Sequence, residues 1–569
     1  MADTDNTPEC SDQAPHAMSR FTQRDLRLMG RSSPKSPLRV IALIDFDAFY
    51  AQCETVRLDL PPTEPLAVQQ WNAIIALNYA AREYGLKRGV SVDDAKVRCP
   101  HLRLQHVATW REGDTDWAYR PDVVQHMRTD KAALEPYRLE SKKALDLVVR
   151  SLPQTSKVEK ASIDEMFVDL SSQVHTILIE RYPCLSMPMQ ASDDDSLPPP
   201  PSDELDWEGD HVLGDHPLQL DWEDVAFSIA AGVVRGLRRN ILDTLRYTTS
   251  AGIGPNKTLA KLGAGYRKPN QQTVITPYAA PDFLSSLKYR KIRGLGRQLG
   301  EKVEAHFHGT TVADLLPVPL KEMQSKLGSK TGLWLHNVVR GSEYSEVTAR
   351  VQIQTMLSQK TFLPSVDGLQ QASKWLRIFA AELYKRVLEM DTPTVRRRPQ
   401  TLAVNHHING RFGPTRSQQT VIPEGAIFSA DLLYTTACDK LQDITSEEPS
   451  WPCAALGVSL SNFMELETQS ASIKSFFSPQ SEDSFGRSRQ GSTKRRLSDV
   501  LSVSGVKKRL TEVAQPTETD SNARHSHAAY EPDVPTDTYL CPSCSKVIAA
   551  LQVLEHLDWH VAIELQAKG

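Results

Sequence analysis

A chain of 569 residues is too long for a single hydrophobic core, so its length predicts several domains. Hydrophobic residues make up 40% of it, which suffices to fold them, and no apolar run approaches the roughly 20 residues that cross a bilayer. The first residues, MADTDNTPEC, lack the charged and apolar regions of a secretory signal, so we expect an intracellular protein without a membrane partner.

The net charge of −4 conceals an uneven distribution of acidic residues. Twelve Asp and Glu and no Lys or Arg lie between Asp193 and Asp224, in a segment that also contains LPPPPSDELDW. Such a composition predicts a solvated loop or insertion. Without this segment the net charge becomes +8, which suits a nucleic-acid partner.

The elements predicted along the chain alternate between strands and helices. Residues 1–34 are expected to be disordered, and the apolar run 38–44 predicts a buried strand. AIIALNYAAREYG predicts a strand followed by a helix, YRLESKKALDLVVRSL a helix, and ASIDEMFVDL a second strand. This alternation continues to about residue 277, apart from the acidic insertion at 186–226, and predicts an α/β domain.

The rest of the chain changes character twice. More helices are expected after KYRKIRGLGRQLG, followed by strand-like runs such as TLAVNHHI and CAALGVSL. From about residue 469 Ser, basic and polar residues dominate, which predicts a disordered tail. A compact Cys/His unit ends the sequence.

Carboxylates interrupt both predicted strands of the α/β domain. Asp45 and Asp47 end the first strand, and Asp164 and Glu165 lie within the second. Adjacent strand residues point to opposite faces, so the latter two can share one site only near a strand end or bend. Clustered buried carboxylates repel each other unless cations neutralise them, which points to two Mg²⁺ and phosphoryl or nucleotidyl transfer. The alternative is that these acids are helix caps or surface residues.

Four motifs resemble those of the Y-family translesion DNA polymerases. Their residues are similar to those of the fungal eta branch of that family. They are IDFDAFYAQCE, NYAAREYGLKRGVSVDDAK, ASIDEMFVDL and SAGIGPNKTLAKLGAGYRKPNQQTVI, and the match runs in order from about residue 38 to 463. The resemblance implies template-directed DNA synthesis past damaged bases such as ultraviolet pyrimidine dimers, from deoxynucleoside triphosphates on a primer–template. The length leaves no room for an exonuclease, so proofreading is not expected.

The resemblance also implies an α/β right-hand architecture with an extra α/β little finger. The expected parts are a palm (35–50 and 117–277), fingers (51–116), a helix-hairpin-helix thumb (278–348), a little finger (349–466), a disordered tail (467–535) and a ββα zinc finger (536–569).

The site residues implied by the resemblance follow from matching positions. Asp45, Asp164, Glu165 and the carbonyl of Phe46 would hold the two Mg²⁺, which leaves Asp47 out of the ligand set. Tyr50 would lie under the sugar as a steric gate against a 2′-hydroxyl, with core packing as the alternative. The nucleotide-binding residues would be Phe49, Tyr50, Gln70, Tyr79, Arg82, Arg88 and Lys268. Tyr79 and Arg82 are three residues apart on a predicted helix, so both can reach one triphosphate.

DNA contacts are expected beyond the palm. In IRGLGRQLG, Gly294 and Gly296 would let backbone N–H groups approach a phosphate, although GLG also suits any tight turn. In TVRRRPQ, Arg396, Arg397 and Arg398 precede a strand, where they would grip the duplex backbone or form a basic loop without a partner.

Two short signals lie in the tail. In SIKSFF, Ile473, Phe476 and Phe477 have the spacing of a sliding-clamp box, although Ser470 replaces the usual Gln. Basic triplets at 494–496 and 507–509 resemble a bipartite nuclear import signal, which predicts a nuclear protein; a charge run that attracts DNA is the alternative.

The Cys/His unit has the spacing of a zinc site. Cys541, Cys544, His556 and His560 would bind one Zn²⁺ tetrahedrally. The predicted helix is acidic and apolar, which disfavours DNA, and it resembles the ubiquitin-binding zinc fingers of the same polymerases, with Asp558 at the ubiquitin contact. A purely structural finger is the alternative. The expected partners are therefore ubiquitin and a monoubiquitinated sliding clamp.

Two other functions remain open from sequence. A nucleotidyl cyclase also places carboxylates around two metals, but it does not explain the predicted thumb, clamp box or basic little finger. A catalytically inactive scaffold at stalled forks is disfavoured by the intact Asp45, Asp164 and Glu165.

Overall fold

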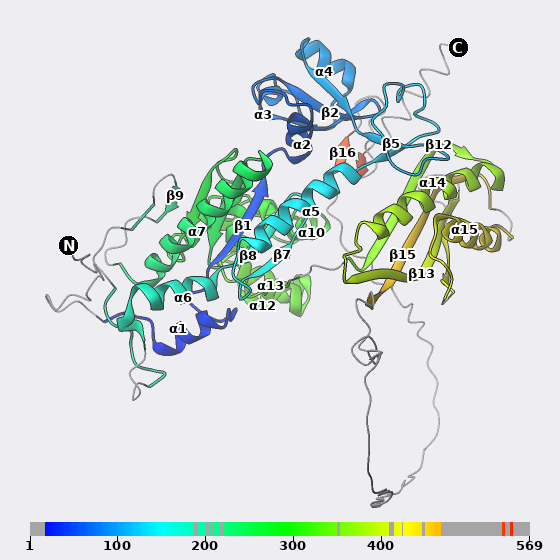
Figure 1. The fold of residues 1–569 in the computed structure, drawn as a ribbon. Coiled ribbons are helices and arrows are strands. Elements are labelled where there is room, and N and C mark those ends of the chain that lie inside the picture. Colours follow the sequence, from blue (N-terminus) through cyan, green and yellow to red (C-terminus); the bar gives the residue numbers. More distant parts are fainter. Residues whose placement is uncertain are drawn as a thin grey trace, which may run out of the picture. The chain divides into compact units, whose positions relative to one another are not determined.

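The computed structural model describes most of the first 467 residues and two short strands near the C-terminus (Figure 1). The described ranges are 18–186, 192–200, 205–207, 210–214, 220–349, 353–408, 415–423, 425–446, 450–467, 538–540 and 547–549. None of the helices in these ranges has the length and apolar character needed to span a membrane.

A mixed six-stranded sheet forms the centre of the first domain, which we call the central domain. Its strands are ordered β7-β8-β1-β10-β11-β9. Their bounds are β1 Ile41–Phe46, β7 Lys157–Lys160, β8 Glu165–Asp169, β9 Asp210–Leu213, β10 Thr249–Gly254 and β11 Gln272–Ile275. β1 pairs antiparallel with β8 and β10, so it lies in the middle and is buried on both faces. This position explains the continuous apolar run that predicted a strand here.

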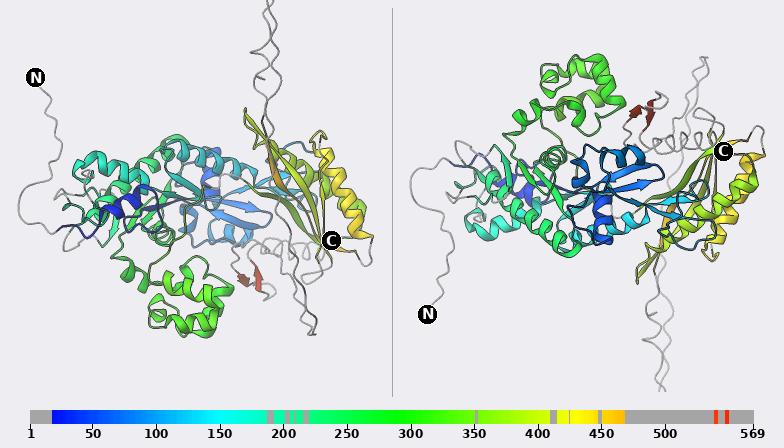
Figure 2. Two further views of the ribbon diagram at one scale, coloured as in Figure 1. Left: turned by 90° about the horizontal axis from the view of Figure 1, so that it is seen from below. Right: turned by 90° about the horizontal axis from the view of Figure 1, so that it is seen from above.

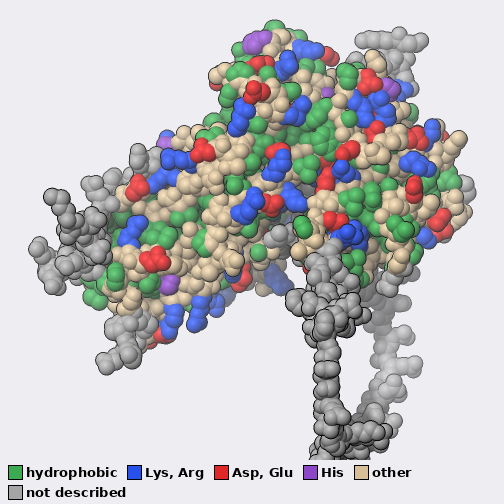
Figure 3. Space-filling model, viewed as in Figure 1, with side chains coloured by type: hydrophobic (Ala, Val, Ile, Leu, Met, Phe, Trp, Pro, Cys, Tyr) green, Lys and Arg blue, Asp and Glu red, His purple; other side chains and the backbone are tan. Residues whose placement is uncertain are grey.

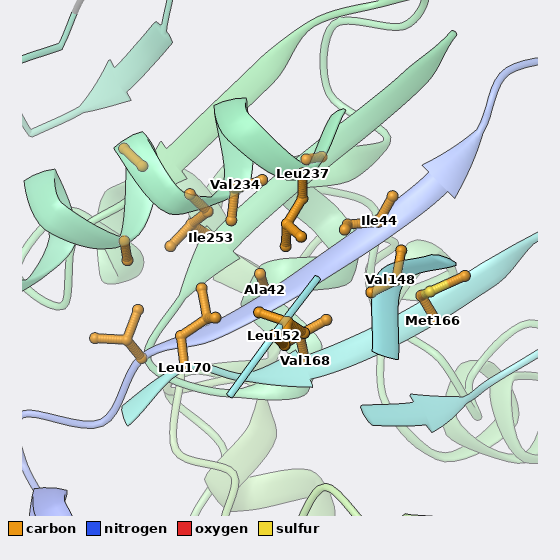
Figure 4. Packing of buried hydrophobic residues seen from close by; sticks show 14 of the residues in the cluster. Ala42, Ile44, Val148, Leu152, Met166, Val168, Leu170, Val234, Leu237 and Ile253 are labelled. Carbon is orange, nitrogen blue, oxygen red and sulfur yellow. The ribbon is translucent and has the colours of Figure 1, made fainter. Parts of the chain in front are cut away.

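Helices cover both faces of this sheet. Ala42 and Ile44 of β1 share a core with Val148, Leu152, Val234 and Leu237 from the segments of α5 and α7 (Figure 4). Ile41 and Leu43 point to the other face and pack with Ala260 and Ala264 of α8. The helices of this domain are α2 Phe49–Arg57, α5 Glu135–Arg150, α6 Ser171–Arg181, η1 Pro183–Leu185, α7 Trp222–Leu245 and α8 Lys257–Ala264. The predicted helix at 137–152 is confirmed as α5.

Gly252 allows α8 to lie close against the sheet. A Cβ atom at this position of β10 would lie 2.0 Å from the carbonyl oxygen of Ala260 and 2.2 Å from the backbone nitrogen of Ala264. Only a residue without a side chain fits such an approach. The contact brings the lysines of α8 next to the acid-bearing strands.

The N-terminal segment is ordered from residue 18, so the expectation of disorder up to residue 34 is wrong for this part. α1 (Gln23–Gly30) begins with a capping box in which Thr22 and Asp25 bond reciprocally to backbone N–H groups. Its apolar side chains Leu26 and Met29 are buried in the central core. The short amphipathic stripe of this helix is hidden in a polar sequence, which explains the error.

The described residues of the acidic insertion at 186–226 differ from the solvated loop that its composition predicts. Its described residues include β9 and the start of α7, and Leu197 and Trp222 are fully buried. Its acids pair with the N-terminal segment: Arg24 lies 2.9 Å from Asp194, and Arg20 and Arg27 form ion pairs with Glu223 and Asp193. Arginines about 170 to 200 positions away thus neutralise charges that look solvated in the sequence.

A small three-stranded sheet follows α2 and has its own core. Its order is β3-β2-β4, with β2 Leu66–Gln70, β3 Ala73–Leu77 and β4 Arg103–His106, and it carries α3 Tyr79–Arg82 and α4 Val92–Arg98. The strand and helix predicted from AIIALNYAAREYG are confirmed as β3 and α3. We call this unit the small sheet.

A helical unit lies between residues 280 and 338 and appears as a separate green cluster in Figure 2. It comprises α9 Ala280–Ser285, η2 Tyr289–Lys291, α10 Gln298–His306, α11 Val312–Leu315, α12 Leu320–Leu327 and α13 Ser329–Val338. Leu295, Val303, Met323 and Leu335 belong to its core. The helices expected after KYRKIRGLGRQLG, which ends at residue 300, are confirmed as α11, α12 and α13.

The four-stranded domain follows the helical unit. Its sheet has the order β12-β15-β13-β14, with β12 Thr355–Val366, β13 Val395–Ile408, β14 Thr415–Val421 and β15 Cys453–Glu467, and two helices, α14 Leu369–Leu388 and α15 Ala430–Thr445, pack together. The strands expected from TLAVNHHI and CAALGVSL are confirmed. Its core also takes in Ala108 and Trp110 of β5 (Ala108–Trp110) and Ala133 of β6 (Lys131–Ala133), which pair with each other.

Near the C-terminus, β16 (Thr538–Leu540) and β17 (Val547–Ala549) form an antiparallel pair. This pair provides the two strands expected of a ββα finger, while its predicted helix and zinc ligands lie outside the described residues.

His406 of β13 is a buried titratable residue in the four-stranded domain. Its ring is fully buried against the edge of Trp451, and neither ring nitrogen has a hydrogen-bond partner among the described residues. Burial, helped by nearby Arg416 and His407, lowers the pKa of His406 from 6.5 to about 4. The folded protein therefore holds this imidazole neutral.

We predict that the four-stranded domain loses stability in acid through His406. As the pH falls below 6.5 the unfolded chain takes up the proton first, so the free energy of unfolding should drop by about 2 kcal/mol by pH 5. His406→Phe should remove this dependence, whereas His407→Asn should keep it. Amide-exchange protection of β13 and β14 at pH 7 and 5, corrected for intrinsic rates, measures the effect; an unchanged acid loss in His406→Phe would contradict it.

Candidate active site

The two acid-bearing strands lie side by side and bring their carboxylates together. The antiparallel register of β1 and β8 places Asp45 directly opposite Glu165, so both side chains share one face of the sheet. Asp164 precedes β8, and its carbonyl accepts a hydrogen bond from the backbone N–H of Phe46 at 2.8 Å. The expectation that these acids meet near a strand end agrees with this geometry.

Two lysines neutralise the opposed carboxylates. Lys261 of α8 places its Nζ 2.7 and 2.6 Å from the two carboxylate oxygens of Glu165. Lys268 forms an ion pair with Asp45. Burial raises the pKa of Asp45 to about 6; Lys268 opposes this rise, and the negative charges of Asp164 and Glu165 add to it. The three carboxylates therefore interact electrostatically in a partly desolvated site.

The donor set fits a hard divalent cation. Carboxylate oxygens, with a backbone carbonyl such as that of Phe46, are the ligands that Mg²⁺ prefers. The two ammonium groups show that the site demands positive charge, although within the described ranges no three acidic, His or Cys side chains are yet gathered closely enough to ligate one ion. A cation would have to compete with these lysines.

Asp47 has a structural role that sequence reasoning missed. It is buried, accepts a hydrogen bond from Ser250 Oγ at 2.6 Å and another from the backbone N–H of Asn270 at 2.8 Å. Asn270 follows Lys268 by two residues, so Asp47 fixes the segment that carries this lysine. This arrangement agrees with the expectation that Asp47 is not a metal ligand.

Tyr50 forms a flat wall beside the acids. Phe49 and Tyr50 begin α2 directly after Ala48, whose φ of +47° turns the chain sharply at the end of β1. Phe49 is buried in the core, whereas the ring of Tyr50 stacks on Tyr137 with centroids 4.1 Å apart and planes 10° apart. Burial raises the pKa of Tyr50, and the charge of Asp164 adds to the effect.

A buried carboxylate holds the partner of Tyr50. The hydroxyl of Tyr137 donates a hydrogen bond to Glu54 at 2.8 Å, and Glu54 is fully buried and paired with Arg57 at 2.7 Å. Sequence reasoning missed Tyr137 and Glu54. The available signal was an acid four residues after Tyr50, about one turn along the same helix and on the same face.

The predicted nucleotide-binding residues Gln70, Tyr79, Arg82 and Arg88 belong to the small sheet and the segments between its strands. The guanidinium of Arg82 lies 4.5 Å from the ring centroid of Tyr79, which confirms that the two share a helix face. Burial raises the pKa of Tyr79, and the negative charges of Asp47 and Asp45 add to the rise. The charge of Arg88 acts on Tyr50. Gln70 is half-buried at the end of β2.

The predicted DNA-binding glycines differ in their surroundings. Gly294 has a φ of +93°, as a tight turn requires, whereas Gly296 has only ordinary contacts around it. The close approach instead occurs at Gly300, where a Cβ atom would lie 1.9 Å from the carbonyl oxygen of Leu295. Sequence reasoning missed Gly300, which allows α10 to start directly against the turn.

The three predicted DNA-binding arginines are not equivalent. Arg396 is exposed, Arg397 lies 3.5 Å from Glu465, and Arg398 pairs with Asp391 at 2.7 and 2.9 Å. DNA contact by these residues stays a prediction, and Arg396 is the best placed of them. The predicted zinc, ubiquitin and clamp residues Cys541, Cys544, His556, His560, Asp558, Ile473, Phe476 and Phe477 lie outside the described part of the chain.

Four family models match the sequence. The impB/mucB/samB family matches residues 44–265 and its C-terminal domain residues 353–473, which cover most of the central domain, the small sheet and the four-stranded domain. The helix-hairpin-helix motif of DNA polymerase eta and Rev1 matches 287–342, and the ubiquitin-binding zinc finger matches 537–568. The chain therefore belongs to the Y-family of DNA-directed DNA polymerases.

Within that family the relatives point to DNA polymerase eta. The chain is 26% identical to DNA polymerase eta of Saccharomyces cerevisiae over 81% of this chain and 82% of that protein. It is 30% identical to DNA polymerase eta of Arabidopsis thaliana over 78% of this chain and 66% of that protein. It is 32% identical to N-acetyltransferase eso1 of Schizosaccharomyces pombe over 97% of this chain but only 64% of that longer protein.

We predict that Asp45→Asn weakens divalent-cation binding by about tenfold or more, because one of the opposed carboxylates loses its charge. Mn²⁺ titration of the full chain, followed by electron paramagnetic resonance, measures this without catalysis. Asp59→Asn is the matched control, since the Asp59 side chain is 81% exposed at a surface ion pair. Equal Mn²⁺ affinity of Asp45→Asn and the unaltered protein would remove Asp45 from the ligand set.

Proposed function

We propose that this chain is a translesion DNA polymerase of the eta kind, which extends primers past damaged template bases without proofreading. The observation that carries the proposal is the pairing of Asp45 with Glu165 on adjacent buried strands, with Asp164 beside them. In this proposal the central domain is the palm, the small sheet the fingers, the helical unit the thumb and the four-stranded domain the little finger.

The chemistry we propose is nucleotidyl transfer at the paired carboxylates. Asp45, Asp164, Glu165 and the carbonyl of Phe46 would hold two Mg²⁺, which supply positive charge for the attacking and leaving oxygens. Lys268 would leave its ion pair with Asp45 and bind the incoming triphosphate, since its ammonium is equally suited to a phosphate. Tyr79 and Arg82 would bind the same triphosphate with a hydroxyl and a fork of donors.

Extension of a primer on a template with a thymine dimer tests this function. We expect adenine to be inserted opposite both thymines, and Asp164→Asn with Glu165→Gln to reduce incorporation by about 10³-fold or more, because charge is lost where the transition state needs it. A complete stall at the dimer with normal synthesis on undamaged template would indicate another branch of the family. No synthesis on any template would favour a cyclase or a scaffold.

The stacked Tyr50 generates a prediction about sugar selection. Its ring is held flat by Tyr137, so removing it in Tyr50→Ala should open space at C2′ and lower discrimination against ribonucleotides by about two orders of magnitude. Tyr50→Phe keeps the ring and should keep the discrimination. The ratio of kcat/KM for deoxynucleotides and ribonucleotides measures the effect, and an unchanged ratio in Tyr50→Ala would place the gate elsewhere.

The C-terminal segments would recruit the enzyme to replication forks. We propose that the zinc finger binds ubiquitin, that Ile473, Phe476 and Phe477 bind the sliding clamp, and that the protein acts in the nucleus. The match to a ubiquitin-binding zinc finger over 537–568 and the acidic, apolar residues of its predicted helix support the first of these. The basic triplets at 494–496 and 507–509 support the last.

We predict that Asp558→Ala abolishes ubiquitin binding by the full chain while its zinc content and primer extension stay unchanged. The substitution removes a carboxylate that is not a proposed zinc ligand, so the finger should stay folded. Titrations with ubiquitin and with duplex DNA, together with metal analysis, measure this. Finger-dependent DNA binding without ubiquitin binding would overturn the assignment.

A further inference from the structure

Gln70 is the last residue of β2, and the turn that follows it toward β3 has a strained backbone conformation. Trp71 has a φ of +54°, a left-handed conformation that is rare for a bulky residue. Its backbone N–H donates to Nε2 of His106 at 2.8 Å, and the opposite nitrogen, Nδ1, lies 2.8 Å from the carbonyl oxygen of Val107. Nε2 must therefore be the acceptor, and Nδ1 carries the proton.

The backbone of this turn is fixed while the Gln70 side chain is not. The side chain of Gln69 donates to the carbonyl of Trp71 at 3.1 Å, and the rings of Trp71 and His106 lie 5.1 Å apart. The Gln70 side chain, by contrast, makes no hydrogen bond to any other described residue and is half-buried. Strained backbone persists where its surroundings over-determine it, and such sites are typically functional.

A lysine from the four-stranded domain contacts this turn at the ring of Trp71. Lys360 of β12 places its Nζ 5.1 Å from the ring centroid of Trp71 and 4.6 Å from that of Trp375 in α14. The same Nζ donates to the carbonyl oxygen of Asp130 at 2.7 Å. Asp130 is itself fixed, because its fully buried carboxylate pairs with Arg111 at 2.9 Å.

This ammonium is well placed to bind the two indoles firmly. It is half-buried, Trp71 is 7% exposed and Trp375 is 8% exposed, so the contact is largely shielded from water. Cation–π contacts with Trp strengthen when they are desolvated. Trp375 also packs on Phe362 and Phe379, so one side of the contact belongs to a rigid core.

We propose that Lys360, clamped between Trp71 and Trp375, is a positioning residue through which the four-stranded domain sets the place of Gln70 in the active site. We call this contact the Lys360 bridge. The proposal rests on the proposed function, in which Gln70 contacts the nascent base pair. While the Lys360 bridge is intact, the four-stranded domain fixes the turn after β2, and Gln70 lies where it contacts the nascent base pair. When the bridge is broken, Gln70 is displaced while the carboxylates remain in place.

The test compares Lys360→Met with Lys360→Arg, because Met keeps the length of the side chain without its charge and Arg keeps the cation. Lys374→Met is the matched control, since Lys374 is exposed on the same helix as Trp375. Steady-state kinetics of the full chain on undamaged primer–template should show KM for the incoming nucleotide raised about fivefold in Lys360→Met, with kcat within about twofold. Lys360→Arg should restore KM, and Lys374→Met should not change it.

A double-mutant cycle identifies the partner of Lys360. Trp375→Leu should raise KM as Lys360→Met does, and the double variant should be no worse than either one, because both break the same bridge. This route avoids a substitution at the strained Trp71. Additive effects, or an unchanged KM in Lys360→Met, would overturn the proposal.

Hydrogen exchange separates this proposal from the proposed function. In protein without DNA, Lys360→Met should speed amide exchange in residues 66–77 at least about threefold, while Lys374→Met should not. Unchanged exchange in Lys360→Met would overturn the bridge even in an active polymerase. Faster exchange in a chain that synthesises no DNA would support the bridge and overturn only the proposed function.

Discussion

The repulsion between carboxylates at the centre of a buried sheet is the constraint on which the candidate site depends. Asp45 and Glu165 lie opposite each other on β1 and β8, and the runs Ile41–Ile44 and Met166–Val168 beside them are apolar, so water can screen the two carboxylates only from one end. Lys268 and Lys261 supply the charge that the strands lack. Each lysine reaches its acid because the chain lies close to the sheet, at Gly252 for α8 and at Asp47 for the segment around Asn270.

A second consequence of burial is the rigidity of the wall beside the acids. Tyr50 could turn freely on the first turn of α2, but Tyr137 stacks on it and Glu54 holds Tyr137 by its hydroxyl. Leaving a carboxylate fully buried is costly unless it is bonded, and Glu54 is bonded to two tyrosines and an arginine. The position of the Tyr50 ring thus depends on a hydrogen-bond network that reaches it through the ring of Tyr137.

Many charged side chains of the described residues form ion pairs between distant segments. On the face seen in Figure 3, Lys and Arg side chains are interspersed with Asp and Glu. Even in the acidic insertion part of the negative charge is neutralised, because Arg20, Arg24 and Arg27 form ion pairs with its acids. Arg398 is similarly bound to Asp391, which leaves Arg396 as the more available cation of its triplet. The number of basic residues in the sequence therefore overstates how many basic side chains are available to bind DNA.

The sequence by itself determined the local chemistry of this protein. The apolar run of β1, the helical spacing of α5 and the adjacency of Asp164 and Glu165 all depend on near neighbours, so they predicted the elements and the hard-metal character of the site. The tertiary structure alone decided which lysine meets which acid, because Lys268 and Asp45 are 223 positions apart. The tertiary structure likewise decided that the N-terminal segment folds as α1, that Asp47 bonds to Ser250 and Asn270, and that Tyr137 supports Tyr50. These contacts arise from packing between distant segments, and no spacing in the sequence records them.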